Sequence, residues 1–146
     1  MTQIADYVAE FKTKAENSAA TRRFTDDELE VLYTVAYGTY QQGQYRRAAS
    51  HFAQLAMYRP TSARFLKGQG ASQFMARMYP QASVTYSFLV LLHPGDAEAL
   101  CMYGHCMLML GRKDAAYPAL RRAVDQQDGS AEFRSRAKAL LELIAD

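Results

Sequence analysis

Leu32-Tyr33-Thr34-Val35-Ala36-Tyr37, followed by Tyr40-Gln41-Gln42-Gly43-Gln44-Tyr45, opens a pattern that recurs twice along this chain of 146 residues. Small residues recur 34 positions apart at Ala36, Gly70 and Gly104, and alanines recur in the same way at Ala48, Ala82 and Ala116. This period is typical of helix–turn–helix repeats, in which small residues let two helices lie close together. We therefore predict an all-α fold with three repeats, over residues 29–62, 63–96 and 97–130.

Large apolar residues recur with the same period. They lie at Leu32, Leu66 and Leu100 and at Phe52, Tyr86 and Leu120. Side chains of this size are expected to fill the space between the paired helices.

Turn residues separate the expected helices. Gly43 and Gly111 suit a turn between two helices, where a left-handed residue is often required, and Arg77 departs from glycine at the same offset. Pro60 and Pro94 are expected to end the second helix of their repeats, because proline cannot continue the hydrogen-bond ladder.

Capping residues mark where helices should begin. Thr25-Asp26-Asp27-Glu28 indicates a capping box before the first repeat, and Asp96 can cap the first helix of the third repeat. Pro80 is tolerated in a first helical turn, whereas Pro118 lies deeper and predicts a late start or a kink. Asp128 stands where the first two repeats carry proline.

The two flanks are also expected to be helical. Residues 1–24 should form an N-terminal amphipathic helix and a linker, outside a repeat domain of residues 25–146. The apolar stripe of that helix comprises Ile4, Tyr7, Val8 and Phe11. It can cap the repeats or dock onto a second copy of the chain, and the sequence leaves both open. Residues 131–145 predict a helix that covers the last repeat.

Stacked repeats of this kind form a short right-handed solenoid, whose concave wall is lined by the first helix of each repeat. The register places the following residues on that wall: Tyr33, Tyr37, Tyr40, Arg64, Lys67, Ala71, Phe74, Met75, Cys101, Met102, His105 and Met109. Such a wall suits an extended peptide with spaced hydrophobic anchors, and methionines can repack around different shapes. Some of these side chains could instead belong to the core between the helices.

Composition argues against several classes of function. Seventeen basic and fifteen acidic residues give a net charge of only +2, which does not favour binding to nucleic acid or to an anionic membrane. The longest apolar run, residues 88–92, is far shorter than the roughly 20 residues that span a bilayer, and the N-terminus does not resemble a signal peptide. We therefore expect no membrane insertion.

The cysteines do not form a persuasive catalytic or metal site. Cys101 and His105 share a helical face, but no third group is placed to orient the histidine. Cys106 points to another side of the helix, which argues against a disulfide and against a shared metal site. Two free thiols fit a reducing compartment. We expect no enzyme activity, no metal and no cofactor.

The spacing and the recurring residues resemble the tetratricopeptide-repeat (TPR) family. More specifically, residues 32–52 and the stretch Arg64-Phe65-Leu66-Lys67-Gly68-Gln69-Gly70-Ala71 resemble the first two repeats of the class II chaperones of bacterial type III secretion. The resemblance covers residues 24–144. It is weaker in the third repeat, where Lys113 replaces an aromatic residue.

This resemblance implies a chaperone of the bacterial cytoplasm, with a role in virulence, that keeps hydrophobic translocator proteins soluble and competent for secretion. It also implies that an extended client segment of the type Pro-x-Leu-x-x-Pro binds in the concave groove, and that a homodimer can form through the N-terminal helices. Tyr33, Tyr37, Tyr40 and Phe74 would form the client pockets. A TPR chaperone of an effector or a needle component, or a TPR adaptor outside secretion, remains open as an alternative.

Overall fold

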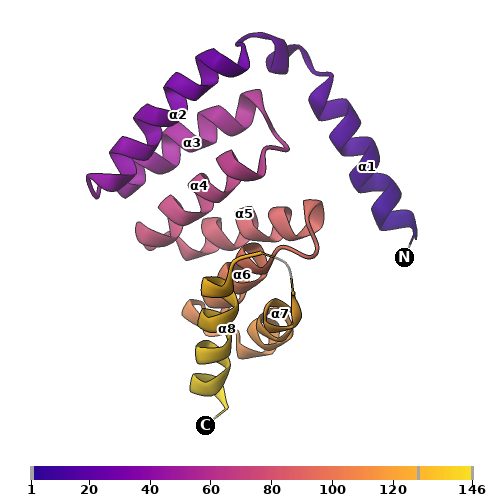
Figure 1. Ribbon diagram of the computed structural model, residues 1–146, viewed down its shortest axis with the longest axis vertical. Helices are drawn as coiled ribbons and strands as arrows, with labels where there is room; N and C mark the ends of the chain where they lie inside the picture. Colours follow the sequence, from indigo (N-terminus) through magenta and orange to yellow (C-terminus); the bar gives the residue numbers. More distant parts are fainter. Residues whose placement is uncertain (1, 128, 146) are drawn as a thin grey trace. The chain divides into compact units, whose positions relative to one another are not determined.

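The computed structural model describes residues 2–127 and 129–145, and this part of the chain is all-helical (Figure 1). The prediction of an all-α fold is therefore confirmed. The helices, in chain order, are α1 (Thr2–Glu16), the short 3-10 helix η1 (Ala19–Arg22), α2 (Asp26–Gln41), α3 (Tyr45–Tyr58), α4 (Ala63–Met75), α5 (Tyr79–Leu92), α6 (Ala97–Met109), α7 (Lys113–Asp125) and α8 (Ala131–Ile144). The chain forms two compact units, Met1–Ala76 and Arg77–Asp146.

Helix starts follow the period seen in the sequence. The second helices α3, α5 and α7 begin at positions 45, 79 and 113, and the helices α4, α6 and α8 begin at positions 63, 97 and 131. The helix α8 therefore begins where the first helix of a fourth repeat would begin.

The predicted caps and turns are confirmed. The Thr25 side chain accepts a hydrogen bond from the Glu28 amide at 3.1 Å, and the Glu28 carboxylate accepts one from the Thr25 amide at 3.0 Å. Asp96 caps α6 by accepting from the Ala99 amide at 3.1 Å. Gly43 and Gly111 have φ angles of +78° and +76°, in the left-handed region that glycine adopts without strain.

Proline positions are confirmed with one exception. Pro60 and Pro94 each follow the end of a helix, and Pro80 lies in the first turn of α5. Pro118 lies inside α7, which begins at Lys113, so the helix does not start late; the alternative, a kink at this proline, stays a prediction. The helix accepts a proline that donates no backbone hydrogen bond to the turn before it. Asp128 lies outside the described residues.

The core of unit 1 is formed by α2, α3 and α4. Its buried residues are Leu29, Ala36, Ala48, Phe52, Leu55 and Phe65. A Cβ atom at Gly68 would lie 2.4 Å from the Phe52 ring, so this glycine lets α4 pack closely on α3. Leu32 was expected to fill the space between helices, but it is 41% exposed. Within the described residues only α1 and η1 come before α2, and neither of them covers this position as a preceding repeat would.

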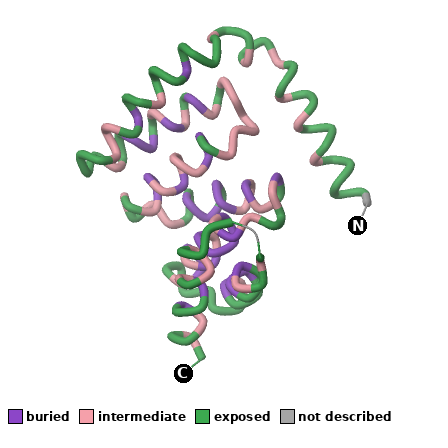
Figure 2. Tube along the Cα trace, in the orientation of Figure 1, coloured by how far each residue is buried: buried purple, intermediate pink, exposed green. Residues whose placement is uncertain are grey.

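The core of unit 2 is formed largely by α6, α7 and α8. Its buried residues are Leu100, Cys101, Met107, Ala116, Leu120, Ala123, Ala137 and Leu140. A Cβ atom at Gly104 would lie 2.6 Å from Leu120, which explains the small residue on α6. Helix α8 buries Ala137 and Leu140 and packs Phe133, Leu141 and Ile144 against the same cluster. The predicted C-terminal capping helix is therefore confirmed, and Figure 2 shows the buried positions along it.

The N-terminal helix α1 is present as predicted, and most of its length is exposed (Figure 2). Ile4 and Tyr7 are both exposed, and Val8 is half-buried. Between α1 and α2, the helix η1 packs on α3. None of the helices within the described residues is long and apolar enough to cross a membrane.

Candidate functional site

An aromatic face lies on α2, beside α4. The rings of Tyr33 and Tyr37, one helical turn apart, are stacked with centroids 6.1 Å apart and planes 15° apart. The Tyr33 ring also meets the buried rings of Phe52 at 5.7 Å and Phe65 at 5.9 Å. Tyr37 is 46% exposed. The face thus joins an anchored ring to an accessible one, and both were predicted to line the groove.

Arg64 extends this face from α4. Its guanidinium carbon lies 3.7 Å from the centroid of the Tyr33 ring, within the range of a cation–π interaction. Its Nη1 and Nη2 atoms donate to the two carboxylate oxygens of Glu30 on α2, at 2.7 and 2.5 Å. These hydrogen bonds lower the pKa of Glu30 and raise that of Arg64. We define Glu30, Tyr33, Tyr37 and Arg64 as the aromatic array.

The other predicted groove residues of unit 1 lie further along α2 and α4. Tyr40 meets Tyr45 edge-on at 5.2 Å, and therefore contacts the turn end of its own repeat. Lys67, Ala71 and Phe74 are half-buried, whereas Met75 is exposed. The structure thus brings Tyr33, Tyr37 and Arg64 into contact, and the remaining predicted residues lie on the same two helices.

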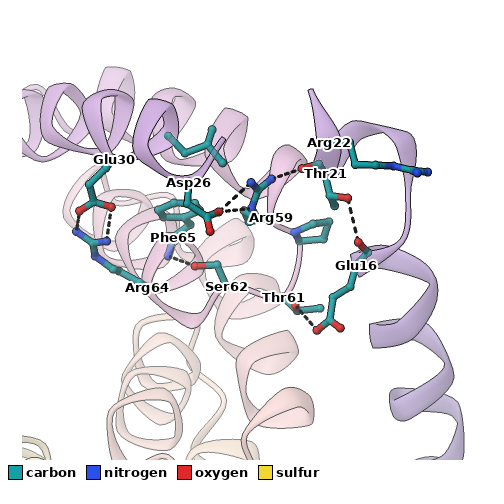
Figure 3. A pocket seen from close by; sticks show the side chains of 12 residues that line it. Glu16, Thr21, Arg22, Asp26, Glu30, Arg59, Thr61, Ser62, Arg64 and Phe65 are labelled. Carbon is teal, nitrogen blue, oxygen red and sulfur yellow. Dashed lines mark hydrogen bonds and ion pairs between the residues drawn. The ribbon is translucent and has the colours of Figure 1, made fainter. Parts of the chain in front are cut away.

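A cavity of about 710 Å³ opens at the N-terminal ends of α2 and α4 (Figure 3). Its lining is mixed. The polar and charged residues are Glu16, Thr21, Arg22, Asp26, Glu30, Arg59, Thr61, Ser62 and Arg64, and the apolar ones are Leu29, Pro60 and Phe65. Three carboxylates and three guanidinium groups balance each other in this lining. The cavity therefore favours neither an anion nor a cation by net charge.

Arg59 connects the walls of this cavity. Its Nε and Nη2 atoms donate to Asp26 Oδ1 at 3.1 and 2.9 Å, and the guanidinium also donates to the backbone carbonyl of Thr21 (Figure 3). A further hydrogen bond runs from Nη2 to the backbone carbonyl of Phe24. Beside it, the Thr61 hydroxyl donates to the Glu16 carboxylate at 3.3 Å. These bonds fasten η1 and the end of α1 to the end of α3.

Two of these features were missed by the sequence analysis. Glu30 and Arg64 are 34 residues apart, so they occupy the same position on the first helices of neighbouring repeats. Opposite charges at equal repeat positions are a signal that could have identified this pair. The bonds from Arg59 to backbone carbonyls leave no comparable trace in the sequence.

In unit 2, the predicted wall on α6 is largely covered by the chain itself. Cys101 is 0% exposed and lies in the core, so the prediction that it lines an accessible groove is wrong. Met102 is also buried, and Arg136 Nη1 of α8 lies 3.3 Å from its sulfur. The physical reason is the packing of α8 on α6, which covers this face as the next repeat would.

His105 and Met109 remain beside an opening. They line a cavity of about 570 Å³ together with Leu108 on α6, Lys113 and Asp114 on α7, and Leu140, Leu143 and Ile144 on α8. Burial lowers the pKa of His105, and the nearby charge of Arg136 lowers it further. The neutral imidazole is therefore favoured, and the cavity has a mainly apolar wall.

The buried thiols have no activated form in this environment. Burial raises the pKa of Cys101 to about 11 and that of Cys106 to about 12, so both are protonated at neutral pH. No group of three or more His, Cys, Asp or Glu residues within the described ranges could hold a metal ion. The arrangement offers apolar and aromatic surfaces for binding.

Comparison with known proteins gives several similar chains, although no family model matches. Low calcium response locus protein H of Yersinia pestis is 27% identical over 129 residues, which cover 86% of this chain and 77% of that protein. PcrH, crystallised with the chaperone-binding region of PopD, is 28% identical with a TM-score of 0.78, covering 84% of this chain and 95% of PcrH. SycD of Yersinia enterocolitica, in complex with a peptide of the translocator YopD, is 27% identical with a TM-score of 0.76, covering 84% of this chain and 96% of SycD.

The paired helices and the aromatic face define a helical-repeat protein of the TPR type that is built for protein binding. The similarity to the translocator chaperones SycD and PcrH is more specific and covers most of both chains. In sequence and in fold, the chain is similar to the translocator chaperones of type III secretion, as its first two repeats indicated.

Proposed function

We propose that this chain binds an extended segment of a hydrophobic translocator protein and keeps that protein soluble and competent for secretion in the bacterial cytoplasm. The observation that carries the proposal is the similarity of this chain to proteins that have been crystallised with segments of their partners. PcrH has been crystallised with the chaperone-binding regions of PopD and of PopB, and SycD with a peptide of YopD. The chain is similar to both over more than four fifths of its length.

The aromatic array and the first helices around it are the proposed client site. Tyr33 and Tyr37 present ring surface on α2, and α4 contributes the half-buried Phe74 and the exposed Met75. A client segment rich in proline is already biased towards an extended conformation, so ordering it on this surface costs less entropy. Apolar side chains that leave water here contribute about 25 cal/mol per Å² before those costs.

In unit 2, the proposal retains His105 and Met109, which line an accessible cavity. Met102 would contribute through packing beneath that surface, because Arg136 already contacts its sulfur. Cys101 has no place in the site, since it is fully buried.

The N-terminal helix is the proposed dimerisation element. Ile4, Tyr7 and Phe11 expose 61%, 62% and 44% of their surface, which is unusual for apolar side chains aligned on one helix face. Val8 completes the stripe. Dimers of the similar chaperone SycD are known.

Co-expression tests the proposed function directly. The partner to test is a hydrophobic protein with predicted membrane helices that is encoded beside this chain in the genome. We expect the partner to be insoluble alone and to co-purify with this chain as a soluble complex. A partner that stays insoluble in its presence would overturn the translocator proposal. A soluble effector or needle component found in the complex instead would favour the alternative clients.

Substitution tests the site. Tyr37→Ala and Phe74→Ala should each weaken binding of the partner's Pro-x-Leu-x-x-Pro segment by roughly tenfold, because each removes apolar surface worth about 1–2 kcal/mol. Calorimetry measures the affinity, and circular dichroism checks that the helical content is unchanged. Val84→Ala on α5 is the control, because it removes an exposed apolar side chain outside the proposed site. Wild-type affinity in both variants would move the site elsewhere.

A further inference from the structure

Arg64 lies in the proposed client site, where it could bind the client directly. Its guanidinium group, however, already interacts with other residues of this chain. Two of its nitrogens donate to Glu30, and its guanidinium carbon lies 3.7 Å from the centroid of Tyr33. An acidic client residue could accept only from the N–H groups that Glu30 does not use, because one N–H group of Nη1 and one of Nη2 already donate to it. The Glu30 carboxylate would at the same time repel it.

We propose that Glu30 and Arg64 are positioning residues, which hold the rings of Tyr33 and Tyr37 in the orientation that receives the client segment. This inference rests on the proposed function and assigns these two charged residues a task within it. The Glu30–Arg64 pair joins α2 to α4 at the same position of neighbouring repeats. The planar guanidinium then contacts the Tyr33 ring, and Tyr33 stacks on Tyr37.

The contacts around Tyr33 explain why a positioning pair is needed. Phe52 and Phe65 meet this ring from the core, at angles of 68° and 31°, and Arg64 meets it from α4. Tyr37, which is nearly half exposed, is stacked on Tyr33 alone among the ring contacts described. Loss of the guanidinium would therefore loosen Tyr33 first and Tyr37 through it. A ring that is already ordered loses less conformational entropy when a peptide binds.

Arginine is suited to this task and lysine is not. The guanidinium is planar, donates two parallel hydrogen bonds to a carboxylate and stacks on an aromatic ring at the same time. A lysine at position 64 would keep the positive charge but could form neither the paired bonds nor the stack. Arg64→Lys therefore separates positioning from simple electrostatic attraction.

Calorimetry with a synthetic peptide tests the inference, the peptide being the Pro-x-Leu-x-x-Pro segment of the co-expressed translocator. We expect Arg64→Lys and Glu30→Gln each to weaken its binding about three- to tenfold. Replacing acidic residues of the peptide by their amides should change the affinity of the wild type less than twofold. Arg112→Lys is the matched control, because Arg112 also pairs with a carboxylate through two nitrogens, at 3.2 Å from Asp114, but lies in unit 2 on the turn before α7.

Nuclear magnetic resonance supplies a measurement that needs no client. The Tyr33 ring should shift the side-chain protons of Arg64 upfield in the wild type, and Glu30→Gln should reduce that shift while broadening the Tyr37 ring signals. If the wild type does not bind the peptide, the proposed function fails while this shift still reports on the array. If the wild type binds and Arg64→Lys binds equally well, the positioning role is overturned and the proposed function stands. A strong loss of affinity on amidating the peptide would make Arg64 a direct ligand and would also overturn it.

Discussion

Each unit contains a contact between helices of neighbouring repeats, α2 with α4 in unit 1 and α6 with α8 in unit 2. The two contacts join residues with the same separation in sequence but leave different surfaces exposed. In unit 1, Glu30 of α2 meets Arg64 of α4, and in unit 2, Met102 of α6 meets Arg136 of α8. Both pairs are 34 residues apart. The first contact leaves Tyr37 nearly half exposed, whereas the second covers Met102 and leaves Cys101 in the core.

This difference shows that repeat position determines which residues meet, but not which residues stay accessible. On α2, two tyrosines stand beside a charged pair whose partners are each about half exposed. The side chains of α6 are smaller or more flexible, so apolar residues of α8 pack directly against α6. Accessibility thus depends on the chemistry of the covering helix, and changes in α8 are the strongest way to alter it.

The largest expected effect on stability comes from truncating a buried side chain of α8, the helix that covers α6 in unit 2. Leu140→Ala should lower the free energy of unfolding by about 2–3 kcal/mol, because it leaves a cavity in a packed core. Urea denaturation followed by circular dichroism measures the change. Leu143→Ala is the matched control on the same helix, since Leu140 is 9% exposed and Leu143 is 73% exposed.

The control should change stability by less than about 0.5 kcal/mol. Equal effects of the two substitutions would mean that α8 does not hold its observed face against α6. In that case the two units would not differ in the way described, and the α6 face would be open as well.

Acidification should produce a smaller effect in unit 2. The pKa of His105 is lowered in the folded chain, so at pH values below about 6.5 the unfolded chain takes up a proton that the folded chain resists. Stability contributed by neutral His105 is therefore present near pH 7.5 and is lost as the pH falls. The charged groups near this histidine are Arg136 on α8 and Lys113 and Asp114 on α7.

The measurement compares urea midpoints at pH 7.5, 6.5 and 5.5. His105→Gln should flatten the decrease relative to the wild type, because the amide does not titrate. His51→Gln removes a histidine from α3 in unit 1 and is the control. The same slope in His105→Gln and in the wild type would show that His105 is not the group responsible.

Periodicity in the sequence was sufficient to predict the helices and many of the caps and turns. Equal spacing of Ala36, Gly70 and Gly104 implies paired helices, and the capping box at Thr25 places the start of α2 at the observed residue. Local chemistry decides such features, so they can be recognised without knowledge of the packing.

Exposure could not be predicted in the same way. Leu32, Leu66 and Leu100 are identical in the register, yet Leu32 is exposed and the other two are buried. Cys101 was predicted to line the groove because the repeat register does not show which residues of α6 are buried by α8. The role of Arg59 also depends on backbone carbonyls that only the folded chain brings together. These features depend on tertiary packing, which a repeat period does not encode.

The smallest expected effect tests whether the turns at residues 43, 77 and 111 are equivalent in their backbone energetics. Gly43 in unit 1 and Gly111 in unit 2 adopt positive φ angles, and Arg77, which begins unit 2, does so at +62° although it is not glycine. A left-handed conformation costs a residue with a Cβ atom about 1–2 kcal/mol, part of which glycine offsets by gaining freedom in the unfolded chain. Arg77→Gly should therefore raise the free energy of unfolding by up to about 1 kcal/mol, and Gly111→Arg should lower it by a similar amount, both measured by urea denaturation. A decrease for Arg77→Gly would mean that the arginine side chain contributes contacts worth more than the strain of its backbone, and the three turns would then not be equivalent.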